Sequence, residues 1–244
     1  MASFFYRLGK MIAPQLRHAN WVYRSLTDTE AEALRAENAV GRDLASALMQ
    51  QMELDREPAV AAMLVDLQYR LAQCLRNRSR RFQFLAVKAP EINAFALPGG
   101  YVFVTRPLLE LCQWNPDEMA FILGHEMAHI VQGHVMDRLL ADSMIRAALG
   151  RLTLGGGLLG KPIIGLAATL VNQGYSRDQE LEADRVGNQL ARQAGFDPTA
   201  AARLFARLRT LGGDRSPLSG YFSAHPSLDI RIHHLENKRG RSTF

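Results

Sequence analysis

The feature that most constrains this chain is a His-Glu-Met-Ala-His pentapeptide that begins at His125 and lies inside a predicted helix. Asn115 at the N-cap, Pro116 at the first helical position and two acidic residues in the first turn predict that the helix runs from there to about Leu140. Four residues advance a helix by about 400°, so the imidazoles of His125 and His129 lie on one face, one turn apart. Two imidazoles in this arrangement can bind one zinc ion.

Glu126 lies beside this pair of histidines, because it is about 100° further round the helix than His125. From that position its carboxylate can accept a proton from a water molecule that attacks a substrate held at the metal. The alternative is that the pattern arises by chance and the histidines only cap or hydrogen-bond the helix. The helical context favours a hydrolytic metal site.

Catalytic zinc sites usually have three protein ligands and one open position, so a further ligand is needed. The best candidates are Glu180 and Asp184, which lie one turn apart on the same face of a helix predicted over residues 176–194. One of these carboxylates can bind the metal while the other accepts the far N–H of a ligating histidine. Glu182 points about 200° away from Glu180 and is predicted to be solvated or salt-bridged, and Arg177 is expected to pair with one of the acids.

The segment before the pentapeptide predicts a small β-sheet. Residues 82–87 and 101–105 are aromatic and β-branched, residues 93–97 lie between them, and Pro98-Gly99-Gly100 forms the turn of a hairpin. The sheet is expected to lie beside the helix that carries the two histidines.

Most of the remaining chain is predicted to be helical. Further helices are expected over residues 28–52, from Pro58 onward, over 199–211 and over 226–237. The result is an α+β fold that is mostly α. Residues 1–57 are predicted to form an N-terminal basic arm and helical extension, and residues 58–244 the metal-binding domain.

These motifs resemble those of the gluzincin metallopeptidases, a family that includes the HtpX-like, BepA-like, Oma-like and CAAX prenyl proteases. The resemblance rests on residues 93–100, on 124–129, on Ser176-Arg177 with Glu180 and Ala183-Asp184, and on His225-Pro226-Ser227 followed by Arg231. It implies a zinc metalloendopeptidase with one Zn²⁺ per chain that hydrolyses protein substrates, with a role in protein quality control. It also implies that Glu180 is the third zinc ligand.

The resemblance further implies that the strand around residues 93–97 borders the substrate cleft. An extended peptide can add to such an edge through main-chain hydrogen bonds, so we expect little sequence preference. The residues expected to bind substrate are Asn93, Ala94, Phe95 and Ala96.

His225 is expected near the zinc. It either occupies the water position in a self-inhibited state, as the matching histidine does in BepA-like members, or stabilises the oxyanion together with Arg231 or Tyr221. Asp184, Arg177 and Arg231 are expected to hold the ligands in place. His134 is about 140° round the predicted helix from His129, so a packing or outer hydrogen-bonding position is expected for it.

Two segments bear on partners and location. Residues 1–27 carry basic and aromatic side chains but no acidic one, which is typical of an arm packed on the domain, a membrane-surface segment or an organelle-targeting segment. Residues 147–171 are the most apolar, yet Arg151, Lys161 and Pro162 interrupt them. We expect a glycine-rich loop that contacts a bilayer surface or gates the site. No secretory signal or transmembrane helix is expected, which favours a cytoplasmic or peripheral membrane location.

The formal net charge of +5 favours anionic partners but says little about function. Nucleic acid is not expected as a partner, because the arginine clusters at 76–81 and 238–241 lack interleaved stacking aromatics apart from Phe82. An alternative function from another class is a non-proteolytic, zinc-stabilised chaperone or scaffold that binds unfolded proteins. The sequence leaves the oligomeric state open.

Overall fold

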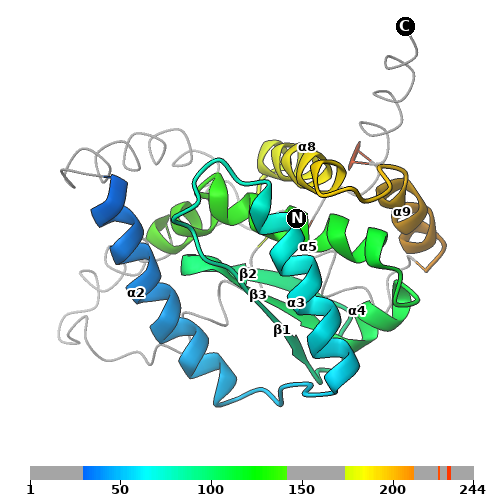
Figure 1. Ribbon diagram of the computed structural model, residues 1–244, viewed down its shortest axis with the longest axis horizontal. Helices are drawn as coiled ribbons and strands as arrows, with labels where there is room; N and C mark the ends of the chain where they lie inside the picture. Colours follow the sequence, from blue (N-terminus) through cyan, green and yellow to red (C-terminus); the bar gives the residue numbers. More distant parts are fainter. Residues whose placement is uncertain (1–29, 142–173, 212–224, 226–229, 232–244) are drawn as a thin grey trace, which may run out of the picture.

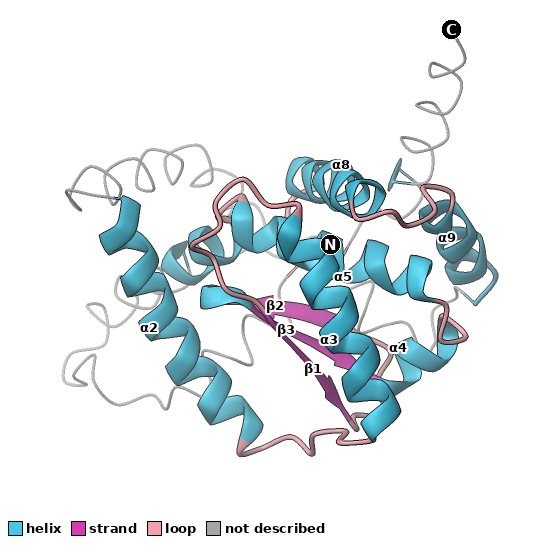
Figure 2. Cartoon of the chain, in the orientation of Figure 1, coloured by secondary structure: helices cyan, strands magenta, loops and turns pink. Residues whose placement is uncertain are grey.

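A computed structural model describes residues 30–141, 174–211, 225, 230 and 231. The elements are α2 (Glu30–Met49), α3 (Pro58–Gln73), β1 (Gln83–Val87), β2 (Ala94–Leu97), the 3₁₀ helix η1 (Pro98–Gly100), β3 (Tyr101–Thr105), α4 (Arg106–Leu111), α5 (Pro116–Val131), α8 (Arg177–Gln193) and α9 (Ala200–Leu211). Figures 1 and 2 show helices arranged around one small sheet. The predicted α+β, mostly α fold is confirmed.

The sheet has the strand order β1-β3-β2, in which β1 and β3 are parallel and β2 and β3 are antiparallel. The predicted hairpin is confirmed, and η1 is its turn. Gly99 has a φ of 73° there, a left-handed conformation that glycine adopts without steric cost. Strand β2 lies at an edge of the sheet, so only one side of β2 pairs with a neighbouring strand, which is β3.

The side chains of the sheet alternate between two hydrophobic layers, as the two-residue period of a strand requires. On one face, residues such as Val102 and Ala96 pack with the buried leucines of α3 and with α5. On the other face, Phe95 and Phe103 stack with ring centroids 5.2 Å apart and pack with Leu44 of α2. Figure 1 shows α3 and α2 running along the sheet. Full burial of one such leucine contributes about 1.5–3 kcal/mol to stability.

The N-terminal end of α5 agrees with the sequence analysis, because the Asn115 side chain accepts hydrogen bonds from the backbone N–H groups of Asp117 and Glu118. The C-terminal end does not: the single helix predicted to about Leu140 is wrong. Helix α5 ends at Val131, Gly133 has a φ of 80°, and residues 134–141 form a separate helical segment. A left-handed glycine is a common way to end an α-helix, because it has no Cβ to clash.

Several predictions concern segments outside the described residues. These segments are the basic arm of 1–27, the glycine-rich stretch of 147–171, Tyr221, and the helix of 226–237 except for Ile230 and Arg231. The division at residue 57 also stays a prediction. Within the described part of the chain, no helix is both long enough and apolar enough to cross a membrane.

Candidate metal centre

Helices α5 and α8 cross at two glycines. A Cβ atom on Gly187 would lie 2.6 Å from the backbone N of His125, and one on Gly124 would lie 2.9 Å from the carbonyl O of Gly187. Only glycine allows two backbones to approach this closely. The crossing therefore brings Glu180 of α8 to the face of α5 that carries His125 and His129.

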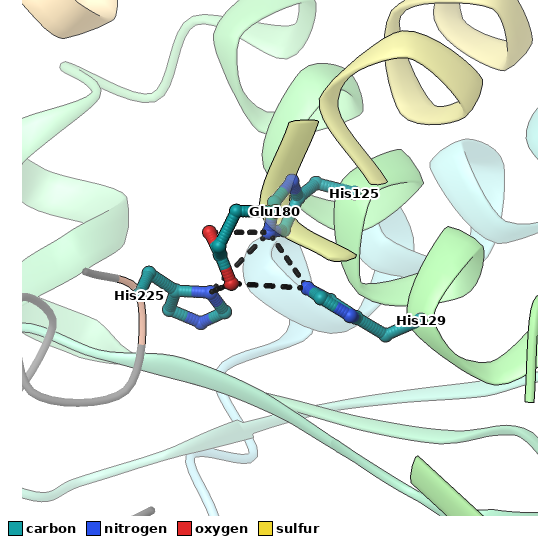
Figure 3. A group of neighbouring side chains, drawn as sticks. All are labelled: His125, His129, Glu180 and His225. Atoms are coloured by element: carbon teal, nitrogen blue, oxygen red, sulfur yellow. Dashed lines mark hydrogen bonds and ion pairs between the residues drawn. The ribbon is translucent and has the colours of Figure 1, made fainter. Parts of the chain in front are cut away.

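Four buried side chains converge at this crossing: His125, His129, Glu180 and His225 (Figure 3). One ligand atom from each lies within 4.8 Å of the others. The Nε2 atoms of His125 and His129 are 3.1 Å apart. The Glu180 carboxylate places Oε1 3.5 Å from Nε2 of His129 and Oε2 3.7 Å from Nε2 of His125.

These distances fit one zinc ion. Two ligand atoms bound at about 2.0–2.1 Å to a tetrahedral ion lie about 3.3–3.4 Å apart, which is the middle of the observed range. Imidazole nitrogen and carboxylate oxygen are also the donors that zinc accepts in catalytic sites. The chain thus brings together the three predicted ligands, and it adds His225 as a fourth group.

Asp184 contacts the ring nitrogen of His125 that points away from the cluster. Its Oδ1 lies 2.9 Å from Nδ1 of His125, so that Nδ1–H can donate to it while Nε2 faces the cluster. Arg231, which is fully buried, donates from Nε to Oδ2 at 2.8 Å and from Nη2 to Oδ1 at 2.7 Å. Burial raises the pKa of Asp184, but Arg231 and His125 outweigh it and lower that pKa to about 2.

Arg177, by contrast, is exposed at the first residue of α8. Among the described residues it makes no ion pair with Glu180 or Asp184. Its expected part in holding the ligands stays a prediction.

His129 contacts Tyr175, for which the sequence contained no motif, and His134, for which a packing or outer hydrogen-bonding position was expected. Tyr175 stacks on the His129 ring with centroids 3.6 Å apart and an interplanar angle of 12°, and the Arg138 guanidinium lies 4.0 Å from the centre of the Tyr175 ring. His134 places Nδ1 3.0 Å from Nδ1 of His129. Burial lowers the pKa of His129 to about 3, so the imidazole is in the neutral form that binds a metal.

His225 lies between two carboxylates. Its Nδ1 is 3.2 Å from Oε1 of Glu180, and its Nε2 is 3.2 Å from Oε1 of Glu126. Burial lowers the pKa of His225, but Glu180 and Glu126 outweigh it and raise that pKa to about 10. The two carboxylates therefore favour the protonated form of the His225 imidazole.

Glu126 is suited to accept a proton. Both of its carboxylate oxygens are buried, and Oε1 lies 3.2 Å from Nε2 of His225. Burial raises the pKa of Glu126, but His225, His125 and His129 together lower it to about 2. The carboxylate is therefore ionised at neutral pH, as a general base must be.

Strand β2 borders the cluster. The carbonyl O of Ala94 lies 3.3 Å from Nε2 of His225, on the edge of the sheet that β3 does not pair. Asn93, Ala94, Phe95 and Ala96 are all buried, so this edge is covered in the structure. Their expected contact with a substrate stays a prediction.

The comparison with known proteins agrees with this geometry. Peptidase family M48 matches residues 56–239, which is most of the chain. The chain therefore belongs to peptidase family M48, and the resemblance inferred from its motifs is confirmed.

Similar proteins include the mitochondrial metalloendopeptidase OMA1 of Schizosaccharomyces pombe, which is 34% identical over 164 residues, 64% of this chain and 46% of that protein. The metalloprotease LoiP of Escherichia coli is 32% identical over 62% of this chain and 60% of its own length. The beta-barrel assembly-enhancing protease of Escherichia coli is 29% identical over 76% of this chain and 40% of its own length. The chain thus spans less than two thirds of each of these relatives.

Proposed function

We propose that this chain is a zinc-dependent metalloendopeptidase whose metal is held by His125, His129 and Glu180. The observation that carries the proposal is the buried convergence of these three side chains from two crossing helices, with the ionised Glu126 beside them. Membership of a peptidase family supports hydrolysis over the alternative of a chaperone or scaffold that only binds proteins.

In the proposed mechanism, Glu126 takes a proton from the attacking water and later delivers it to the leaving amine. When bound, zinc supplies Lewis-acid polarisation of the scissile carbonyl and lowers the pKa of the attacking water. Asp184 and Arg231 keep Nε2 of His125 directed toward the metal. The edge of β2 that β3 does not pair would bind the main chain of the substrate and orient the scissile bond.

The proposal is tested by metal removal. Treatment of the full chain with a strong chelator is expected to abolish casein hydrolysis, because the three ligand side chains alone have no electrophile to offer the carbonyl. One equivalent of zinc per chain is expected to restore hydrolysis, with metal content measured by mass spectrometry. Undiminished hydrolysis by chain shown to be free of metal would contradict the proposal.

We further propose that the structure corresponds to a closed state in which His225 takes the fourth metal position. Four protein ligands complete a tetrahedral site, whereas catalysis needs one position open for water. His225 also lies beside the Ala94 carbonyl, at the edge where a substrate strand would pair. One residue thus blocks both the water position and the strand edge, and it must withdraw before turnover.

Replacement of His225 by alanine is accordingly expected to raise the rate of casein hydrolysis, with the zinc content unchanged. The reason is that the three remaining ligands hold the metal while the fourth position opens to water. If His225 instead stabilises the oxyanion, the same change lowers kcat by about 10²- to 10³-fold. A protein that only binds unfolded chains shows no hydrolysis with either residue. Steady-state kinetics of both proteins distinguish the three outcomes.

As substrates we propose unfolded or misassembled proteins, in keeping with protein quality control. Pairing with a strand edge through main-chain hydrogen bonds recognises extended chain with little regard to its side chains. Such a site selects for unfolded segments, because folded proteins rarely present one. Contact with a membrane surface through residues 1–27 or 147–171 remains part of this proposal.

A further inference from the structure

His134 lies against the second proposed zinc ligand on the side away from the metal cluster. Its Nδ1 is 3.0 Å from Nδ1 of His129, and only 4% of the residue is exposed. Nδ1 is the nitrogen that His129 leaves free when Nε2 faces the cluster. The contact exists because Gly133 ends α5 and turns the chain, so that His134 faces back toward the preceding helical turn.

The other ring nitrogen of His134 reaches a carboxylate at the surface. Nε2 lies 3.4 Å from Oε2 of Glu182, whose side chain is 43% exposed. The second oxygen of Glu182 accepts a hydrogen bond from Nε2 of Gln132 at 2.6 Å. A continuous line of polar contacts therefore runs from the surface of α8 to a buried metal ligand.

The chemistry of these groups fixes where the protons lie. A histidine that binds metal through Nε2 carries its proton on Nδ1, so His129 donates and Nδ1 of His134 accepts. A neutral His134 then carries its own proton on Nε2 and donates it toward the Glu182 carboxylate, which can only accept. Each group thus has the donor or acceptor that its neighbour needs.

We propose that His134 and Glu182 are positioning residues that fix the tautomer and ring orientation of His129. They do for this ligand, through an imidazole, what Asp184 does directly for His125. The inference rests on the proposed zinc site. It gives Glu182 a structural role, whereas helical periodicity alone predicts a solvated or salt-bridged side chain.

Two substitutions at one position test the proposal. In His134→Asn the amide oxygen can take the place of Nδ1 and still accept from His129, whereas in His134→Gln the longer amide reaches the Nε2 position and leaves His129 without its acceptor. The zinc affinity of the full chain is measured by competition with a chelator. We expect His134→Gln to lose about 10- to 100-fold and His134→Asn to lose less than about 10-fold. The absorption spectrum of the Co²⁺-loaded chain should shift more for the glutamine variant.

A surface pair supplies a test that does not depend on a core substitution. Glu182→Gln is expected to weaken zinc binding about 3- to 10-fold, because the neutral amide is a poorer acceptor for His134. Asp178→Asn makes the same chemical change at an exposed position of the same helix and is expected to leave zinc affinity unchanged.

Three results in the variants would overturn the proposal that His134 and Glu182 position His129. These are parental zinc affinity in His134→Gln, equal losses in His134→Asn and His134→Gln, or parental affinity in Glu182→Gln. If the parent binds zinc and the variants respond as expected but casein is not cleaved, the proposed peptidase function fails and the proposed positioning of His129 stands. A parent chain that binds no zinc would overturn both.

Discussion

The Glu126→Gln variant is expected to lose casein hydrolysis while it still binds one zinc ion per chain. Glutamine has nearly the same shape as glutamate, but its amide cannot accept the proton of the attacking water. Loss of a general base costs about 10²- to 10⁴-fold in rate. The proposed ligands are unaffected, because Glu126 lies beside the ligand atoms and is not one of them.

Two measurements on the same sample decide this prediction: zinc content by mass spectrometry and turnover of casein. The matched control is Glu91→Gln, the same chemical change at an exposed residue, which is expected to leave both unchanged. Parental turnover by Glu126→Gln would end the proposed mechanism. Loss of both zinc and turnover would mean that Glu126 helps to bind the metal.

The Gly187→Ala variant is expected to unfold more easily than the parent and to bind zinc at least about 10-fold more weakly. Helix propensity alone gives the opposite sign, since alanine is favoured over glycine by about 1 kcal/mol in a helix. The close packing of α8 against α5 is expected to outweigh this gain in helix propensity. The added Cβ would lie 2.6 Å from the backbone N and 2.8 Å from the Cα of His125, and backbone atoms of a packed helix cannot easily move away.

The magnitude follows from overpacking, which typically costs about 1–3 kcal/mol. The separation of α8 from α5 also withdraws Glu180 from the two histidines, which is why metal binding should fall with stability. Urea denaturation and chelator competition measure the two effects. The control Gln189→Ala, on an exposed position of α8, is expected to stay within about 0.5 kcal/mol of the parent. A Gly187→Ala protein as stable as the parent would show that the helices can separate without cost.

Much of the local structure could be predicted because its signals are short in range. The cap at Asn115, the proline at Pro116 and the turn around Gly99 each fix a few backbone angles without help from the rest of the chain. The same holds for the one-turn spacing of Glu180 and Asp184, which needs only a regular helix.

The end of α5 could not be predicted in the same way. A glycine inside a helix costs only about 1 kcal/mol, so Gly133 was compatible with either a continuous helix or a break. The position of His134 depended on that choice. With a continuous helix, His134 would point about 140° away from His129, and with the break it lies 3.0 Å from it.

What the sequence determined by itself is the set of chemical groups: two histidines one turn apart, a glutamate beside them, and two acids one turn apart on another helix. Only the tertiary structure decided that these groups meet, that His225 joins them from 100 residues away, and that His134 contacts one of them. The reason is physical. Periodicity fixes directions within one helix, whereas the distance between helices is set by contacts such as the one between Gly124 and Gly187, which no local pattern contains.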